Sequence, residues 1–296
     1  MKEFIITRLD EEEIRKIFPN IMKTVHGESG IFEKIAQHIS AATRWISREF
    51  TGYGIKSGDV PGNVASLLLE MAATEAYRSA LHSLDVVLTP NGFATVGNNN
   101  MSPASKARVE SLERELTDRR DSDLEALLSP EGLTSVPGWI DSRQAQKWRS
   151  CFATPFEIAS VTGAVHGRYS SGMERFPLAR VMQYPLVEEF ISPELFETLA
   201  LENQEGWKTD GTPDAEKKAA MRRKVFNDCR DMVLDAVRKS SESGKREMIS
   251  VKKAQAVVDV LRNHADIFPE WHSSATALLF EPPVFRNRKN ATGYFF

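Results

Sequence analysis

The six histidines are the side chains best suited to proton transfer or metal binding near neutral pH, and they are scattered along the chain. Two of them lie close to a carboxylate, because His26 precedes Glu28 and His264 precedes Asp266. Such a pair could bind a metal ion or shuttle a proton. Each pair lacks a third and a fourth ligand nearby, so helix caps and structural histidines explain them better, and no metal site is predicted.

No established catalytic motif is present, since the chain lacks a Walker-type glycine loop, a GxSxG turn and an HExxH helix. Residues 92–97 (GFATVG) lack the lysine and the strand-before-helix setting of a phosphate loop. On a helix, the carboxylates of residues 121–125 (DSDLE) would point in different directions, which is typical of a solvated helix face and not of a cation site. No cofactor is expected. A soluble helical enzyme is one alternative, and it predicts a concave pocket that gathers some of His166, Arg168, Glu174 and Arg175.

The composition is that of an ordinary globular protein of one large or two moderate domains. The 296 residues are 41% hydrophobic and 27% charged, with a net charge of −3. Lysine and arginine are spread along the chain, which argues against a dedicated duplex-DNA binder but leaves room for a surface along which DNA slides. Cys151 and Cys229 are too few for a zinc site or a disulfide framework, and reduced thiols are expected.

Neither a signal peptide nor a membrane span is predicted. The N-terminal residues turn acidic too early for a signal peptide. No apolar run reaches the roughly 18–20 residues that a bilayer requires. We expect a protein that is made in the cytoplasm and stays there or in a particle assembled there.

Helical periodicity dominates the first half and predicts a mainly α fold of helical bundles with long inter-helix loops and an extended C-terminal tail. Apolar residues recur at helical spacing over residues 30–50, 61–88 and 103–128, and Ser102 before Pro103 is a plausible N-cap. Two prolines and two glycines then interrupt the pattern over residues 129–138. The predicted division is a helical domain at 1–130, a second mainly helical domain at 139–279 and an extended arm at 280–296.

The second half repeats the order of the first: an aromatic helix, a loop, a long helix, a connector and another helix. Helices are predicted over 141–151, 175–201, 214–241 and 251–263, and residues 155–171 stay open between helix and strand. Within the second of these, Ser192 is a predicted N-cap with Pro193 at the first helical position. An ancient duplication would explain the shared order, but any set of helical hairpins produces a similar one.

Two segments are candidates for protein interaction. Residues 89–105 form a connection far longer than the roughly 2–8 residues that a helical hairpin needs, and it carries turn residues beside apolar ones. The C-terminal arm has two prolines that favour an extended course, and it ends in aromatic residues that need to be buried. The predicted contact residues are Thr89, Pro90, Asn91, Gly92, Phe93, Phe285, Tyr294, Phe295 and Phe296.

Several stretches resemble a family of uncharacterised proteins from phages and prophages of Bacteroidetes, whose members look like head–tail connector (adaptor) proteins. The resemblance covers residues 84–109, 151–156 with 176–199, 265–274 (ADIFPEWHSS) and the terminus from Phe285 (FRNRKNATGYFF). It implies a non-enzymatic virion protein that forms a ring, of twelve copies in such adaptors, between the portal and the tail. The implied partners are other copies, the portal protein and tail or neck proteins.

The resemblance also implies a location in the virion neck, after synthesis in the host bacterial cytoplasm. DNA would pass through the channel without sequence-specific binding. A neck stopper or a tail-completion protein would have the same features, and the sequence does not separate these positions. A cytoplasmic scaffold or regulator without a ring is a further alternative.

Overall fold

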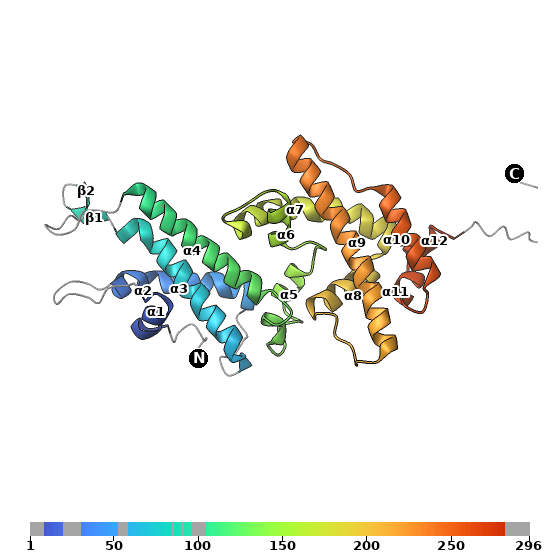
Figure 1. Ribbon diagram of the computed structural model, residues 1–296, viewed down its shortest axis with the longest axis horizontal. Helices are drawn as coiled ribbons and strands as arrows, with labels where there is room; N and C mark the ends of the chain where they lie inside the picture. The colour runs from blue at the N-terminus through green and yellow to red at the C-terminus, as the bar shows by residue number, and fades with distance from the viewer. Residues whose placement is uncertain are drawn as a thin grey trace, which may run out of the picture.

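The computed structural model describes residues 9–19, 31–52, 59–84, 86–89, 92–95 and 105–281. The molecule is elongated, with the first half of the chain at one end and the second half at the other (Figure 1). Helices account for nearly all regular structure in these residues. The prediction of a mainly α fold is therefore confirmed.

Three helices build the first half around α3 (Gly62–Leu84). Helix α3 packs against α2 (Ile31–Ile46) and α4 (Lys106–Leu127), and α1 (Glu11–Ile17) lies against it as well. Its alanines Ala72, Ala73, Ala76 and Ala80 are fully buried, so small side chains let the neighbouring helices approach closely. Helices α2 and α4 occur where the apolar periodicity predicted helices, but α3 ends at Leu84, whereas the periodicity predicted a helix as far as Leu88.

The connection between α3 and α4 differs from the loop that was expected. Strands β1 (Val86–Thr89) and β2 (Gly92–Thr95) pair in antiparallel register, with Val86 opposite Thr95 and Thr89 opposite Gly92. The run Val86-Val87-Leu88-Thr89 favours an extended backbone because β-branched residues dominate it. The prediction of Ser102 as the cap of the next helix is wrong: Ser105 precedes α4.

After residue 138, the described residues contain eight α-helices. They are α5 (Arg143–Trp148), α6 (Pro155–Val161), α7 (Arg168–Leu186), α8 (Pro193–Gln204), α9 (Pro213–Ser243), α10 (Val251–Asn263), α11 (Pro269–His272) and α12 (Ala275–Leu278). Residues 155–171, left open by the sequence, are helical in α6 and at the start of α7, and no strand lies there. The predicted N-cap is confirmed, since the Ser192 hydroxyl accepts a hydrogen bond from Leu195 N at 3.2 Å.

Two hydrophobic cores divide the described residues. The first draws on residues from Leu9 to Trp148 together with Phe156 and Tyr169, and the second on residues from Cys151 to Ala277. Residues just after η4 (Leu133–Ser135), including Trp139, are buried in the first core. The chain thus passes from one core to the other near Ser150, and the predicted division into domains stays a prediction.

Both halves contain the same unusual helix ending. Helix α2 continues into the π-helical turn η2 (Ser47–Thr51), and α7 continues into the π-helical turn η5 (Val187–Ile191). Each turn ends at a residue with positive φ, Gly52 at 73° and Ser192 at 79°. In each, the N–H of that residue donates to the carbonyl five residues earlier at 2.8 Å. The positive φ suits glycine and is rare for serine.

A tryptophan caps each of these turns in the same way. The indole N–H of Trp139 donates to the Phe50 carbonyl at 2.7 Å, and that of Trp271 donates to the Phe190 carbonyl at 2.8 Å. The two phenylalanines occupy the same position in their turns, two residues before the positive-φ residue. Carbonyls at the end of a helix lack intrahelical donors, so a buried indole N–H fills that role in both halves.

The segments around the two tryptophans also correspond. In each segment a proline lies two residues before the tryptophan. A serine, Ser142 or Ser274, lies three residues after it, and the serine hydroxyl caps the next short helix. Helix α5 lies against η2, and helix α12 lies against η5. The side chains of Gln144 and Thr276 donate to the equivalent carbonyls of Arg48 and Glu188 at 3.3 and 3.1 Å.

The correspondence extends to the short helix that opens each half. Helix α1 is capped by Asp10 and helix α6 by Thr154, and both caps accept from the backbone N–H of a glutamate three residues on. The next residue, Ile14 in α1 and Ile158 in α6, is fully buried in each case. These elements recur in the same order in two parts of the chain, although α3 and α4 lie between the π-helical turn and the tryptophan in one part and α8, α9 and α10 in the other. We call residues 9–148 the first unit and residues 153–281 the second unit.

Candidate functional site

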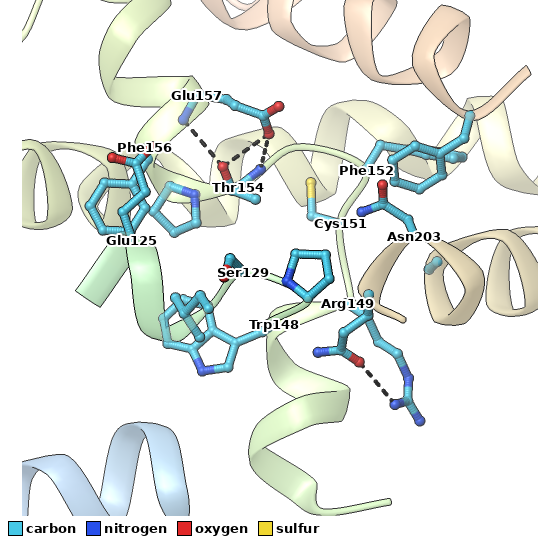
Figure 2. A pocket seen from close by; sticks show the side chains of 16 residues that line it. Glu125, Ser129, Trp148, Arg149, Cys151, Phe152, Thr154, Phe156, Glu157 and Asn203 are labelled. Carbon is cyan, nitrogen blue, oxygen red and sulfur yellow. Dashed lines mark hydrogen bonds between the residues drawn. The ribbon is translucent and has the colours of Figure 1, made fainter. Parts of the chain in front are cut away.

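The junction between the two units holds the polar side chains that an enzyme hypothesis would use. A pocket of about 320 Å³ at this junction is lined by residues of α4, α5, α6, α8 and α9. Figure 2 shows the side chains that line it. Phe152 lies in it and packs edge-on against Phe196, with ring centroids 4.7 Å apart. The pocket is thus built around the segment that crosses from one core to the other.

Several polar groups of this pocket have partners within the chain. Thr154 and Glu157 form a reciprocal capping box at the start of α6, drawn as dashed lines in Figure 2. Arg149 donates to the Ile140 carbonyl at 2.6 Å and to the Gln204 amide oxygen at 3.2 Å. Burial raises the pKa of the Cys151 thiol to about 12, so the nucleophilic thiolate is scarce at neutral pH. These groups hold the junction together.

A single glutamine clamps the crossing segment. The Gln183 amide oxygen accepts from Phe152 N at 3.0 Å, and its amide nitrogen donates to the Ser150 carbonyl at 2.8 Å. Gln183 is buried. Both hydrogen-bonding ends of the side chain therefore bind the backbone of the crossing segment, and the buried Phe152 N–H gains its partner in this way.

The carboxylates of α4 bind the beginning of α7. Asp121 accepts from Tyr169 N at 2.9 Å and is itself paired with Arg120 at 2.6 Å. Asp118 accepts from Gly167 N at 3.3 Å and lies 2.5 Å from the His166 ring nitrogen Nδ1. Carboxylates stabilise a helix N-terminus because its first N–H groups lack partners. Part of the acidic run at residues 121–125 thus joins the units and is not simply a solvated face.

The four side chains of the enzyme alternative do not share one pocket. Arg168 pairs with Glu125 at 2.9 Å on the surface, while His166 is occupied by Asp118. Arg175 lies 3.8 Å from Glu174 and donates to the Ser171 carbonyl at 3.3 Å. His166 does border a shallow hollow on α4, but the other three side chains do not line it. The pocket that this alternative requires is not formed by these residues.

One carboxyl group stands out electrostatically. The Asp123 oxygen Oδ2 is buried without a hydrogen-bond partner. Burial and the neighbouring Glu70 charge raise the pKa of Asp123 to about 7, against the opposing charge of Arg119. Arg119 is engaged by Glu70 and by the Ile17 carbonyl. Asp123 is therefore a source of pH-dependent stability between α3 and α4.

A basic groove of about 850 Å³ lies between η2, α5 and α7. Arg48, Arg143, Lys147 and Arg180 line it, with Glu49 among them. Burial raises the pKa of Glu49, but hydrogen bonds from Lys147 and Arg48, both at 2.6 Å, outweigh it and leave the pKa below its ordinary value. The groove keeps a positive charge, which suits an acidic partner segment or a phosphate backbone.

The predicted interaction residues are only partly described. Thr89 ends β1, and Gly92 and Phe93 begin β2, so these three belong to the hairpin between α3 and α4. Pro90, Asn91, Phe285, Tyr294, Phe295 and Phe296 lie outside the described residues. The structure places the hairpin at the end of the molecule opposite α12 (Figure 1). Their role in binding stays a prediction.

Neither a metal cluster nor a membrane span occurs in the described part of the chain. Over those residues, no three His, Cys, Asp or Glu side chains are grouped so that they could hold a metal ion. None of the helices described there combines the length and the apolar character needed to cross a bilayer.

Comparison with known proteins gives one match. No curated protein and no solved structure matches the chain. Residues 32–145 match the model of a family of unknown function, DUF6712. This stretch is less than half of the chain and runs from α2 into α5, so the similarity to that family lies within the first unit.

Proposed function

We propose that this chain is a non-enzymatic structural protein of a bacteriophage virion, a connector subunit that forms a ring between the portal and the tail. The observation that carries the proposal is the tandem of two helical units, in which the polar side chains serve as caps and clamps. Residues such as Asp121, Gln183 and Trp271 all bind backbone groups of the chain itself. Residues 84–109 and the C-terminal stretch resemble phage connector proteins, and this resemblance is the reason for proposing a place in a bacteriophage virion.

The mechanism in this proposal is geometric. Rigid two-unit subunits lie side by side around a channel, and their contacts are repeated at every interface of a closed ring. Weak contacts then add up to a durable junction through multivalency. The hairpin residues Thr89, Gly92 and Phe93 and the arm beyond Glu281 serve as contact segments to neighbouring copies and to the portal. The positive groove beside Arg143 and Arg180 faces an acidic surface or the DNA path.

A neck stopper or a tail-completion protein is the second candidate, because the same two units and arm would serve there with a different partner. A soluble helical enzyme is less well supported, since His166 and Arg168 form separate ion pairs with α4. A cytoplasmic scaffold would share the fold but would bind no portal.

The test is binding to a candidate portal protein. The purified chain and the portal are mixed, their complex is isolated by size-exclusion chromatography, and negative-stain images are recorded with and without the portal. A ring seated on the portal supports the connector. A chain that ignores the portal but binds an isolated tail or neck protein favours the second candidate, and one that binds neither rejects a place in the neck.

A further inference from the structure

Two hollows adjoin on the exposed side of α7. The first is the basic groove between η2, α5 and α7, and the second, of about 630 Å³, lies between α7, η5, α8 and the loop before α10. Ser150 and Arg180 line both of them. We call the two hollows together the α7 groove. It extends from residues of the first unit to residues of the second.

One face of α7 and of its continuation η5 lines this groove. Pro177, Arg180, Val181, Tyr184 and Glu188 recur at spacings of three and four residues, and all five are exposed. Val181 is 47% exposed and Tyr184 is 63% exposed. Tyrosine and arginine are enriched where protein surfaces bind one another. An exposed valine and tyrosine beside an arginine, all within a groove, therefore indicate a binding surface.

The groove is positively charged although the chain as a whole is not. The net charge of the chain is −3. The α7 groove, in contrast, brings together five cations and two carboxylates, which are Arg48, Arg143, Lys147, Arg180 and Arg246 with Glu49 and Glu188.

Three of these cations remain available to a partner. Glu49 accepts from Lys147 and from Arg48, each at 2.6 Å. Arg143, Arg180 and Arg246 are exposed, and none of them forms an ion pair with another residue that the structure describes. Arginine stays charged at any physiological pH, and its guanidinium can bind a carboxylate through two hydrogen bonds. The groove thus presents charge that an acidic partner would neutralise.

The two ends of the groove differ in chemistry, and this difference decides between partners. The end at η2 and α5 is lined by charged and amide side chains. The end at α8 is lined mainly by Val181, Val187, Phe196 and prolines, together with Arg246 and Glu188. A phosphate backbone suits only the first end, because apolar side chains cannot bind phosphates. A polypeptide can present carboxylates to one end and an apolar anchor to the other.

We propose that the α7 groove binds an extended segment of a partner protein, in which acidic residues lie next to an apolar or aromatic anchor. The acidic residues pair with Arg143 and Arg180, and the anchor packs against Tyr184 and Phe196. This proposal goes beyond the connector role. It follows from the groove alone, and its test requires no portal, so the two proposals can fail separately.

The test is fluorescence anisotropy with the full-length chain and labelled peptides. The probe peptide carries four glutamates, a glycine–serine spacer and a leucine–phenylalanine pair, and the same sequence is also measured in reverse order. One comparison peptide has lysines in place of the glutamates. Another has serines in place of the leucine and phenylalanine. Labelled oligo(dT), a single-stranded DNA, tests for binding of a phosphate backbone.

The basic end is tested by a variant that carries Arg143→Ala and Arg180→Ala. Its matched control carries Lys217→Ala and Lys218→Ala, which remove the same charge from exposed positions at the beginning of α9, outside the groove. Since all four side chains are exposed, circular dichroism should show that both variants are folded.

The apolar end is tested by a variant that carries Val181→Ser and Tyr184→Ser. Its control is Val165→Ser, because Val165 is 77% exposed and lies outside the groove in the loop before α7. Hydroxyl-radical footprinting of the wild-type chain, with and without the probe peptide, reports whether Tyr184 is covered.

We expect the probe peptide to bind the wild type and both controls in one of its two orders. The basic variant and the apolar variant should each bind it about tenfold more weakly, and so should the wild type bind the two comparison peptides. Added salt should weaken binding to the wild type more than binding to the basic variant, because salt screens exposed ion pairs. Tyr184 should become protected only when the peptide is bound.

The proposal is overturned if neither order of the probe peptide binds, or if the basic variant binds it as tightly as the wild type does. Stronger binding of oligo(dT) than of the peptide would assign the groove to a nucleic acid, and protection of Tyr184 in the free monomer would mean that another part of the chain fills it; either result also overturns the proposal. Peptide binding by a chain that ignores the portal would uphold the groove and reject the connector. Portal binding by a chain that binds no peptide would reject the groove alone.

Discussion

Replacing each capping tryptophan by phenylalanine tests whether the two halves are one repeated unit. Trp139 is 1% exposed and Trp271 is 2% exposed, and their indole hydrogen bonds to Phe50 and Phe190 have nearly the same length, 2.7 and 2.8 Å. Trp139→Phe and Trp271→Phe keep an aromatic ring at the site but remove the donor. If the units are equivalent, the two substitutions should have similar effects on stability.

The expected magnitude follows from two losses. A buried carbonyl left without its donor costs about 1–3 kcal/mol of unfolding free energy. Phe50 is buried and Phe190 is half-buried, so the loss at Phe190 should lie toward the lower end of this range. The smaller ring leaves a void that adds about 1 kcal/mol. Each substitution should therefore lower the unfolding free energy by about 2–4 kcal/mol. Trp207→Phe is the control: its ring is only partly buried, and we expect a loss below about 1 kcal/mol.

The assay is urea unfolding followed by far-ultraviolet circular dichroism, because each substitution also changes the tryptophan fluorescence. If the units unfold in separate transitions, Trp139→Phe should shift the transition of the first unit and Trp271→Phe that of the second. A large loss at one tryptophan and almost none at the other would refute the structural equivalence. If neither Trp139→Phe nor Trp271→Phe lowered the unfolding free energy by more than Trp207→Phe does, the capping role of both tryptophans would be refuted.

Three further predictions concern packing, charge and the arm. Because the raised pKa of Asp123 makes the folded state hold a proton that the unfolded state releases, stability should fall as pH rises from about 4 to about 7. Asp123→Asn should remove this loss and stabilise the folded state by about 1–2 kcal/mol at pH 8, a value discounted for the partial exposure of the side chain. Near pH 4 the substitution should have little effect. Equal effects at both pH values in thermal unfolding would contradict the prediction. Gly172→Ala should destabilise by about 1–3 kcal/mol, because a Cβ there would lie 1.9 Å from the Pro155 carbonyl oxygen; an unchanged urea midpoint would contradict this. Phe295→Ala with Phe296→Ala should leave the circular dichroism unchanged and reduce the yield of assembled particles; an unchanged yield would remove the arm from assembly.

Helix positions could largely be predicted because apolar spacing indicates the buried face of a helix. The helix predicted over residues 61–88 was too long, since residues 86–88 lie in β1. The pattern from Val251 to Leu261 gave a helix with the observed bounds, and Ser192-Pro193 correctly marked a helix start. The hairpin between α3 and α4 was missed, since its strands are only four residues long and lie among turn residues. The position of the core boundary also needed the structure, because Trp139 is buried by contacts with residues far away in sequence.

The duplication was visible only as a shared order of helices, although the sequence carried a sharper signal. Val136-Pro137-Gly138-Trp139 and Phe268-Pro269-Glu270-Trp271 share a buried apolar residue, a proline and a tryptophan at the same spacing. So few shared residues do not identify a repeat by themselves, because the partner carbonyls lie more than eighty positions away in each half. The junction residues Asp118, Gln183 and Gln204 carried no local signal, since their roles depend on tertiary contacts.

The central claim is that this chain is a structural component of the virion neck. The most direct measurement is electron cryomicroscopy of purified particles from the strain that encodes the chain, with a small tag fused to its N-terminus. The account predicts tagged chains in the particle and tag density in a ring at the head–tail junction. Particles that lack the chain, or that carry it anywhere other than the neck, would contradict it.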